Sequence, residues 1–107
     1  WKKMTDLVAG GNDLSNVYYA LSSSFDYIPY CTTNGAFNGH IDGRGNTITM
    51  KVNDGYSMFE SIDEDGVIEN LNFVCESYTA NEHFNALVVL NNYGLITNCN
   101  VRIESML

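Results

Sequence analysis

Basic residues are scarce in this sequence. Among 107 residues there are five Lys and Arg against 13 Asp and Glu, which gives a formal net charge of −8. A nucleic-acid-binding surface needs cations to neutralise phosphates, and binding to anionic lipid has the same requirement. Long apolar runs are also missing, since none approaches the roughly 18 residues that span a bilayer. We therefore expect neither nucleic-acid binding nor membrane insertion by this chain.

Cysteine is too sparse for a metal knuckle. The three cysteines, Cys31, Cys75 and Cys99, include no Cys-x-x-Cys pair, and an odd number cannot all pair with one another. Free thiols that behave as small hydrophobic residues are favoured, and one disulfide with a leftover thiol is the alternative. The sequence also has no N-glycosylation sequon and no signal peptide. Because it begins at Trp1 and ends directly after a strand-like segment, we expect a piece of a longer protein.

Asparagine and glycine, in contrast, are abundant, with 14 and nine residues. Part of this abundance belongs to an internal repeat with an offset of 28: residues 66–76 read GVIENLNFVCE and residues 94–104 read GLITNCNVRIE. Five of the 11 positions are identical, and four more exchange one apolar residue for another. A recurring unit of this length is typical of a solenoid, in which successive units stack on one another.

A more diverged copy precedes these two. At an offset of 23, three of its apolar residues align with the first full copy: Ile48, Met50 and Val52 with Leu71, Phe73 and Cys75. This alignment places Thr47 opposite Asn70. Upstream of the strands, the same reasoning matches Phe37 with Phe59 at an offset of 22, and Phe59 with Leu87 at 28.

Each unit predicts short strands with one buried face. Apolar and polar residues alternate with period two, as at Leu71, Phe73 and Cys75, and glycine and Asx residues flank these segments. No segment of helical length separates equivalent strands, so they must stack directly and form parallel sheets. We expect an all-β parallel β-helix of about three to four coils, and we expect it to be a fragment of a longer solenoid.

A corner is predicted where the alternation breaks, because Ile68 and Leu71 are both apolar and lie three residues apart. Asn70 and Asn98 occupy this corner in the two full copies, and Thr47 occupies it in the earlier one. An asparagine there can form hydrogen bonds within its own coil and with the next. Thr47, Asn70 and Asn98 are therefore predicted to form a structural ladder.

The first residues follow a different pattern. Trp1, Met4, Leu7 and Val8 have helical spacing, which stops at Gly10 and Gly11 and predicts a short helix over residues 1–10. Stacked strands are predicted over residues 17–107, so the whole of residues 1–107 reads as one domain. The end of a solenoid exposes its core unless it is covered, and we expect the helix to be that cap.

Three segments resemble bacterial surface β-helix proteins. Residues 37–48 read FNGHIDGRGNTI, residues 57–62 read SMFESI, and residues 66–71 read GVIENL. They resemble the repeats of GLUG-motif proteins and of the ectodomains of IgA1-specific metallopeptidases, and more generally pectate-lyase-like proteins. The resemblance implies a right-handed parallel β-helix and an extracellular or cell-surface location. The shared residues are glycines, corner asparagines and core apolar residues, so it implies no particular chemistry.

Catalytic and metal-binding residues are few. His40 lies beside a turn, with Asp42 two residues on, and His83 lies in an insertion that is predicted to be a loop. Asp63, Glu64 and Asp65 form an acidic turn, which supplies too few oxygens at good geometry for the six to eight that calcium takes. We expect no cofactor, with calcium at this turn as the weaker alternative.

The outward face of the repeated strands carries the candidate ligand-binding residues, which are Lys51, Asn72, Asn100 and Arg102. Long polar side chains in a strip can bind a sugar chain, although any sheet face in water shows similar residues. We expect a non-catalytic module of a secreted or cell-surface protein, with a role in adhesion, glycan binding or scaffolding. Its partner would be a glycan, a host or cell-surface protein, or the rest of a longer chain. The alternatives are the substrate-facing part of a polysaccharide lyase or glycosidase, and an accessory ectodomain of a surface peptidase.

Overall fold

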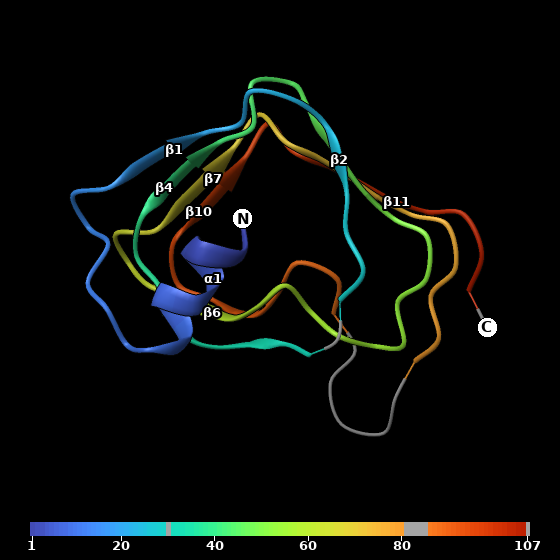
Figure 1. Ribbon diagram of the computed structural model, residues 1–107, viewed down its shortest axis with the longest axis horizontal. Coiled ribbons are helices and arrows are strands. Elements are labelled where there is room, and N and C mark those ends of the chain that lie inside the picture. Colours follow the sequence, from blue (N-terminus) through green and yellow to red (C-terminus); the bar gives the residue numbers. More distant parts are fainter. Residues whose placement is uncertain (30, 81–85, 107) are drawn as a thin grey trace.

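The computed structural model describes residues 1–29, 31–80 and 86–106. It contains one short helix at the N-terminal end, α1 (Lys2–Ala9), followed by eleven strands (Figure 1). The strands are β1 (Tyr18–Ala20), β2 (Phe25–Asp26), β3 (Thr33–Phe37), β4 (His40–Asp42), β5 (Thr47–Met50), β6 (Phe59–Ile62), β7 (Val67–Glu69), β8 (Asn72–Cys75), β9 (Val89–Asn92), β10 (Leu95–Thr97) and β11 (Asn100–Ile103).

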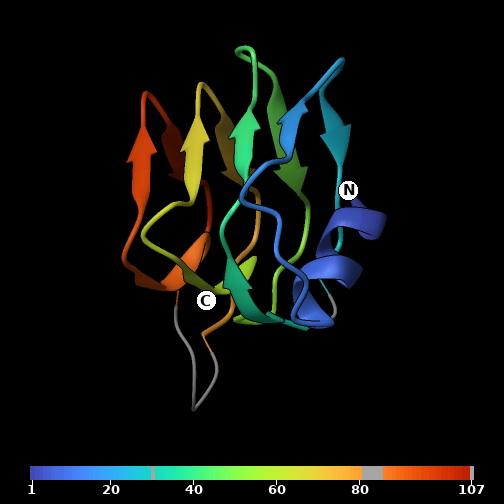
Figure 2. The ribbon, with the colours of Figure 1, turned by 90° about the vertical axis from the view of Figure 1, so that its left-hand side faces the viewer.

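The strands form three sheets that the chain visits in turn. Sheet A has the order β1-β4-β7-β10, sheet B the order β2-β5-β8-β11 and sheet C the order β3-β6-β9. All pairings between these strands are parallel. Each passage through the sheets, here called a circuit, adds one strand beside its counterpart in the previous circuit (Figure 2). The prediction of parallel all-β structure with a short N-terminal helix is therefore confirmed.

The 28-residue repeat is confirmed in the last two circuits. Ile96 pairs with Ile68 in sheet A, and Val101 pairs with Phe73 in sheet B. Gly66 and Gly94 stack at the same turn, and a Cβ atom on Gly94 would collide with the backbone oxygen of Gly66. The repeated glycine is thus required by the close approach of two backbones.

The offset of 23 for the earlier copy is wrong, because Ile48 pairs with Phe73 and Met50 with Cys75, at an offset of 25. The turn before β5 contains four residues, 43–46, whereas the turn before β8 contains two, 70–71. Since side chains in a strand alternate with period two, a slip of two residues keeps the same face buried and is invisible to the apolar pattern. The slip has a visible consequence at Val52, which was aligned with buried Cys75 but is 52% exposed.

The matches expected in sheet C are also wrong. Phe37 pairs with Ile62 rather than Phe59, whose partner in β3 is Thr33. In the next circuit Phe59 pairs with Val89 rather than Leu87. The turns and insertions between circuits differ in length, so no single offset relates all strands of this sheet.

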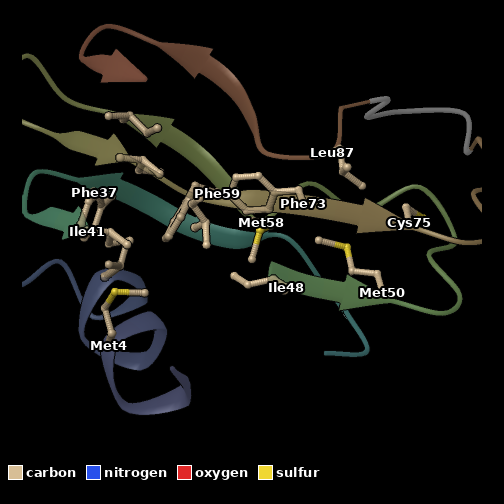
Figure 3. Close-up of a cluster of buried hydrophobic side chains, with 14 of the residues drawn as sticks. Met4, Phe37, Ile41, Ile48, Met50, Met58, Phe59, Phe73, Cys75 and Leu87 are labelled. Atoms are coloured by element: carbon tan, nitrogen blue, oxygen red, sulfur yellow. The ribbon is translucent and has the colours of Figure 1, made fainter. Parts of the chain in front are cut away.

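The core lies between the three sheets and is closed at one end by α1. Side chains such as Met4, Phe59 and Phe73 meet there (Figure 3). Met4 and Val8, four residues apart and therefore on one face of the helix, are both buried. Gly35 in β3 has a φ of +93°, and a Cβ atom there would lie 2.6 Å from the backbone oxygen of Val8. Glycine at this position lets the helix backbone rest directly on the sheet.

The opposite end of the molecule has no such cover among the described residues. Strands β9, β10 and β11 are the last strands of their sheets, and we call this side the open end (Figure 2). Val101 is 53% exposed there and Ile96 is only partly buried, although they continue the rows of fully buried Phe73 and Ile68.

Candidate functional site

The corner between sheets A and B is built around left-handed residues. Asn70 and Asn98 have φ values of 56° and 50°, a conformation that asparagine tolerates better than most residues. The Nδ2 of Asn98 donates to the Oδ1 of Asn70 at 2.7 Å, and the Nδ2 of Asn70 donates to the Oδ1 of Asp42 at 3.0 Å. The row at this corner is thus Asp42, Asn70 and Asn98, which we call the corner ladder.

Thr47 does not belong to this ladder. It lies in β5 and pairs with Asn72, two residues beyond the predicted position. The cause is the longer turn of residues 43–46, which moves Thr47 out of the corner and onto the sheet.

Asp42 begins the corner ladder as a group that only accepts hydrogen bonds. The hydroxyl of Tyr18 donates to its Oδ2 at 2.6 Å, and the backbone N–H of Arg44 donates to its Oδ1 at 2.9 Å. These hydrogen bonds, with that from Tyr18 foremost and that from Asn70 next, lower the pKa of the Asp42 carboxyl to about 2. The carboxylate therefore stays charged to lower pH than an ordinary aspartate does.

A second ladder lies beside the first, at the start of sheet B. The Nδ2 of Asn100 donates to the Oδ1 of Asn72 at 3.0 Å, and the Nδ2 of Asn72 donates to the backbone oxygen of Gly45 at 3.1 Å. Both asparagines keep part of their polar surface at the boundary of two neighbouring hollows on the outside of the molecule.

The larger of these two hollows is a groove of about 550 Å³ across the outer face of sheet B. Strands β5, β8 and β11 and the residues directly after β8 and β11 line it. These residues are Thr47, Thr49, Asn72, Phe73, Val74, Glu76, Asn100, Arg102 and Glu104. The smaller hollow, of about 360 Å³, adjoins the corner and shares Asn72 and Asn100 with the groove. We refer to the larger one as the outer groove.

Three of the four predicted ligand-binding residues come together in the outer groove: Asn72, Asn100 and Arg102. The fourth, Lys51, is exposed but follows the end of β5 and does not line the groove. Lys51 has the outward parity of Thr47 and Thr49 and directly follows β5, as Glu76 follows β8 and Glu104 follows β11. Neither the slip of two residues nor the end of the strand therefore explains why it does not line the groove.

Sequence reasoning missed the acidic residues of the groove. Glu76 and Glu104 are equivalent in the repeat and have the same parity as the outward residues of their strands, so the pattern contained the signal. The Nη2 of Arg102 lies 3.0 Å from the Oε1 of Glu104, and both side chains are largely exposed. The groove therefore offers hydroxyls, amides, one guanidinium and two carboxylates, without a surplus of positive charge.

The remaining candidates for chemistry are dispersed. The Nε2 of His40 lies 2.8 Å from the Oε2 of Glu69, but the contact does not have hydrogen-bond geometry. Asp63, Glu64 and Asp65 are exposed in their turn. In residues 1–29, 31–80 and 86–106, no three His, Cys, Asp or Glu side chains gather in a way that could hold a metal ion. His83 lies outside the described residues.

The three cysteines are free thiols. Cys75 is buried and Cys99 half-buried, and burial raises the pKa of both thiols, as expected for small hydrophobic residues. Cys31 is exposed instead, and it lines a cavity of about 730 Å³ between α1, β2 and β3. This cavity, with Trp1, Phe25 and Tyr27 among its walls, had no signal in the sequence because it exists only where the helix meets the sheets.

The only helix in the described part of the chain, α1, has eight residues and is far too short to cross a membrane. Comparisons of the chain with protein-family models, with curated proteins and with solved structures gave no match.

Proposed function

We propose that this chain is a right-handed parallel β-helix module of a secreted or cell-surface protein, and that it binds a glycan in the outer groove without catalysing a reaction. The cyclic order of strands through three parallel sheets supports the β-helix. The resemblance to GLUG-motif proteins supports its handedness and location.

The observation that carries glycan binding is the repetition of polar side chains across the outer groove. Thr47, Asn72 and Asn100 form one row over three neighbouring strands, and Thr49, Val74 and Arg102 form the next. Such rows repeat at the strand spacing of roughly 4.8 Å. A linear sugar chain also presents hydroxyl groups at regular intervals, and hydroxyls, amides and a guanidinium can donate to and accept from them.

The acidic residues of the groove favour binding over hydrolysis. Glycosidases place two carboxyl groups on opposite sides of the scissile bond. Glu76 and Glu104 instead come from equivalent positions of the repeat, directly after the adjacent strands β8 and β11, and therefore approach a ligand from the same side. Because Arg102 is already paired with Glu104, a neutral glycan fits the groove better than a polyuronate.

A glycan array with the intact chain, followed by titration calorimetry on any glycan retained, tests this proposal. Replacing Thr49 and Arg102 by Ala should weaken binding at least about tenfold, because each lost hydrogen bond is worth about 1 kcal/mol. Lys51→Ala is the matched control, since it removes an exposed polar side chain outside the groove, and it should leave affinity unchanged. If folded protein retains no glycan, or if Lys51→Ala weakens binding as much as the double variant, the proposal is wrong.

A further inference from the structure

The open end has unpaired strand edges that continue a pattern used inside the molecule. In the interior, β8 is covered on both sides by β5 and β11, and its Phe73 is 1% exposed. On β11 the corresponding Val101 is 53% exposed, because no described strand follows β11. On β10, Ile96 continues the fully buried row of Ile41 and Ile68 and is itself only partly buried.

The asparagine ladders run in one direction, with donors toward the preceding circuit and acceptors toward the open end. Asn98 and Asn100 each use Nδ2 to donate to the preceding circuit, at Asn70 and Asn72. The Oδ1 atom of each side chain lies on the other side of the amide and accepts no hydrogen bond from the described residues. The open end therefore presents two acceptors beside an apolar row, and it needs donors at the same two positions.

The acceptors at the open end limit which protein surfaces can pack against it. Two open ends that faced each other would oppose acceptors to acceptors at both ladders. The opposite end of a second copy has α1 resting on β3 at Gly35, and its residues at the two ladder positions are Ala20 and Ser24 rather than asparagines. Neither end of a second copy thus offers an asparagine donor at both ladder positions of the open end.

We propose that the open end is a docking surface for a strand–turn–strand segment that carries the same repeat and lies parallel to β10 and β11. Its two asparagines would donate to Asn98 and Asn100, as these do to Asn70 and Asn72. Its apolar residues would cover Ile96, Val101 and Ile103, which are only partly buried or exposed. The surface continues an interface that the molecule already contains, between β7–β8 and β10–β11, in the register of the 28-residue repeat.

A peptide with the sequence of residues 94–107 is the probe, added to the isotope-labelled full chain and followed by NMR. Amide shifts should be confined to β9, β10, β11 and their turns. The same peptide with Asn98→Asp and Asn100→Asp lacks both donors and should bind at least about tenfold more weakly. Val101→Lys in the full chain should abolish the shifts, whereas Val52→Lys, at a position with almost equal exposure outside the open end, should not.

Several outcomes would overturn this inference. They are equal binding by the two peptides, shifts centred on α1 and β1–β3, no shifts on folded protein, and self-association of the chain through the open end in sedimentation experiments. The glycan experiment is independent of all of them, because the variants at Thr49 and Arg102 remove only outward side chains of sheet B. A failure of docking therefore leaves the proposed function standing, and the converse also holds.

Discussion

The two ends of this molecule differ in how well their apolar core is covered. Each end carries the edges of parallel sheets and the end of the apolar core between them. At the first end α1 places Met4 and Val8 in the core, and Trp1 packs near Phe25 and Phe59, with ring centroids 5.7 and 6.1 Å apart. At the open end the last strands leave apolar residues in water. The difference teaches that the repeat alone builds a stack but does not terminate it.

The largest expected effect separates the interior from the open end. Phe73→Ala should lower the free energy of unfolding by about 3–5 kcal/mol, because it leaves a cavity in a packed core. Val101→Ala, in the same row one strand further on, should cost about 0.5 kcal/mol or less, because its side chain is half in water. Urea unfolding of both variants measures the difference. Similar losses would mean that the open end is covered in solution.

A smaller effect is expected at the capped end. Gly35→Ala combines a strained positive φ with a clash against Val8, and should cost about 2–3 kcal/mol. Gly45→Ala is the matched control: its φ is +79°, but nothing lies within 4 Å of the added Cβ atom, so it should cost only about 1 kcal/mol.

Trp1 fluorescence reports on the packing of the capped end, because Trp1 is the only tryptophan and belongs to the cap. Its fluorescence should shift toward that of exposed indole in Gly35→Ala under native conditions, and should not shift in Gly45→Ala. If both variants keep the native emission and lose equal stability, contact between α1 and β3 is not what holds the cap.

The contrast between the ends also shows what the sequence could predict. The 28-residue offset located the strands of sheets A and B in the last two circuits, because the corner turns between them, 70–71 and 98–99, have equal length. The alignment predicted for the earlier circuit was wrong by two residues, because a shift of two residues keeps the same face of the strand buried and leaves the apolar pattern unchanged. The site followed the same rule. Asn72, Asn100 and Arg102 were found from outward parity, Glu76 and Glu104 were readable by that parity but overlooked, and the cavity beside α1 depends on tertiary packing that no local pattern encodes.

The smallest effect concerns the start of the corner ladder, on the side of the capped end. Asp42 has a pKa of about 2 in the folded protein, below the ordinary aspartate value of 3.8. A carboxyl whose folded pKa is lowered contributes stability that is fully present above its unfolded pKa and is lost as the pH falls through the folded pKa. Between about pH 4 and 2 the native protein should therefore lose this contribution, as its hydrogen bonds from Tyr18 and Asn70 meet a protonated acid.

Asp42→Asn removes this titration while keeping an oxygen that Asn70 can reach. Its urea midpoint should fall less steeply than that of the native chain between pH 4 and 2, although other carboxyl groups will lower both. Asn98→Asp places a carboxylate at the other end of the same ladder, where it loses the donor to Asn70 and gains no donor from a following circuit. It should lower stability most at neutral pH and recover in part on acidification, the opposite dependence to that of Asp42. If the stability of the two variants depends on pH in the same way, the ladder has no donor-to-acceptor direction. The inference that the open end presents acceptors would then be wrong.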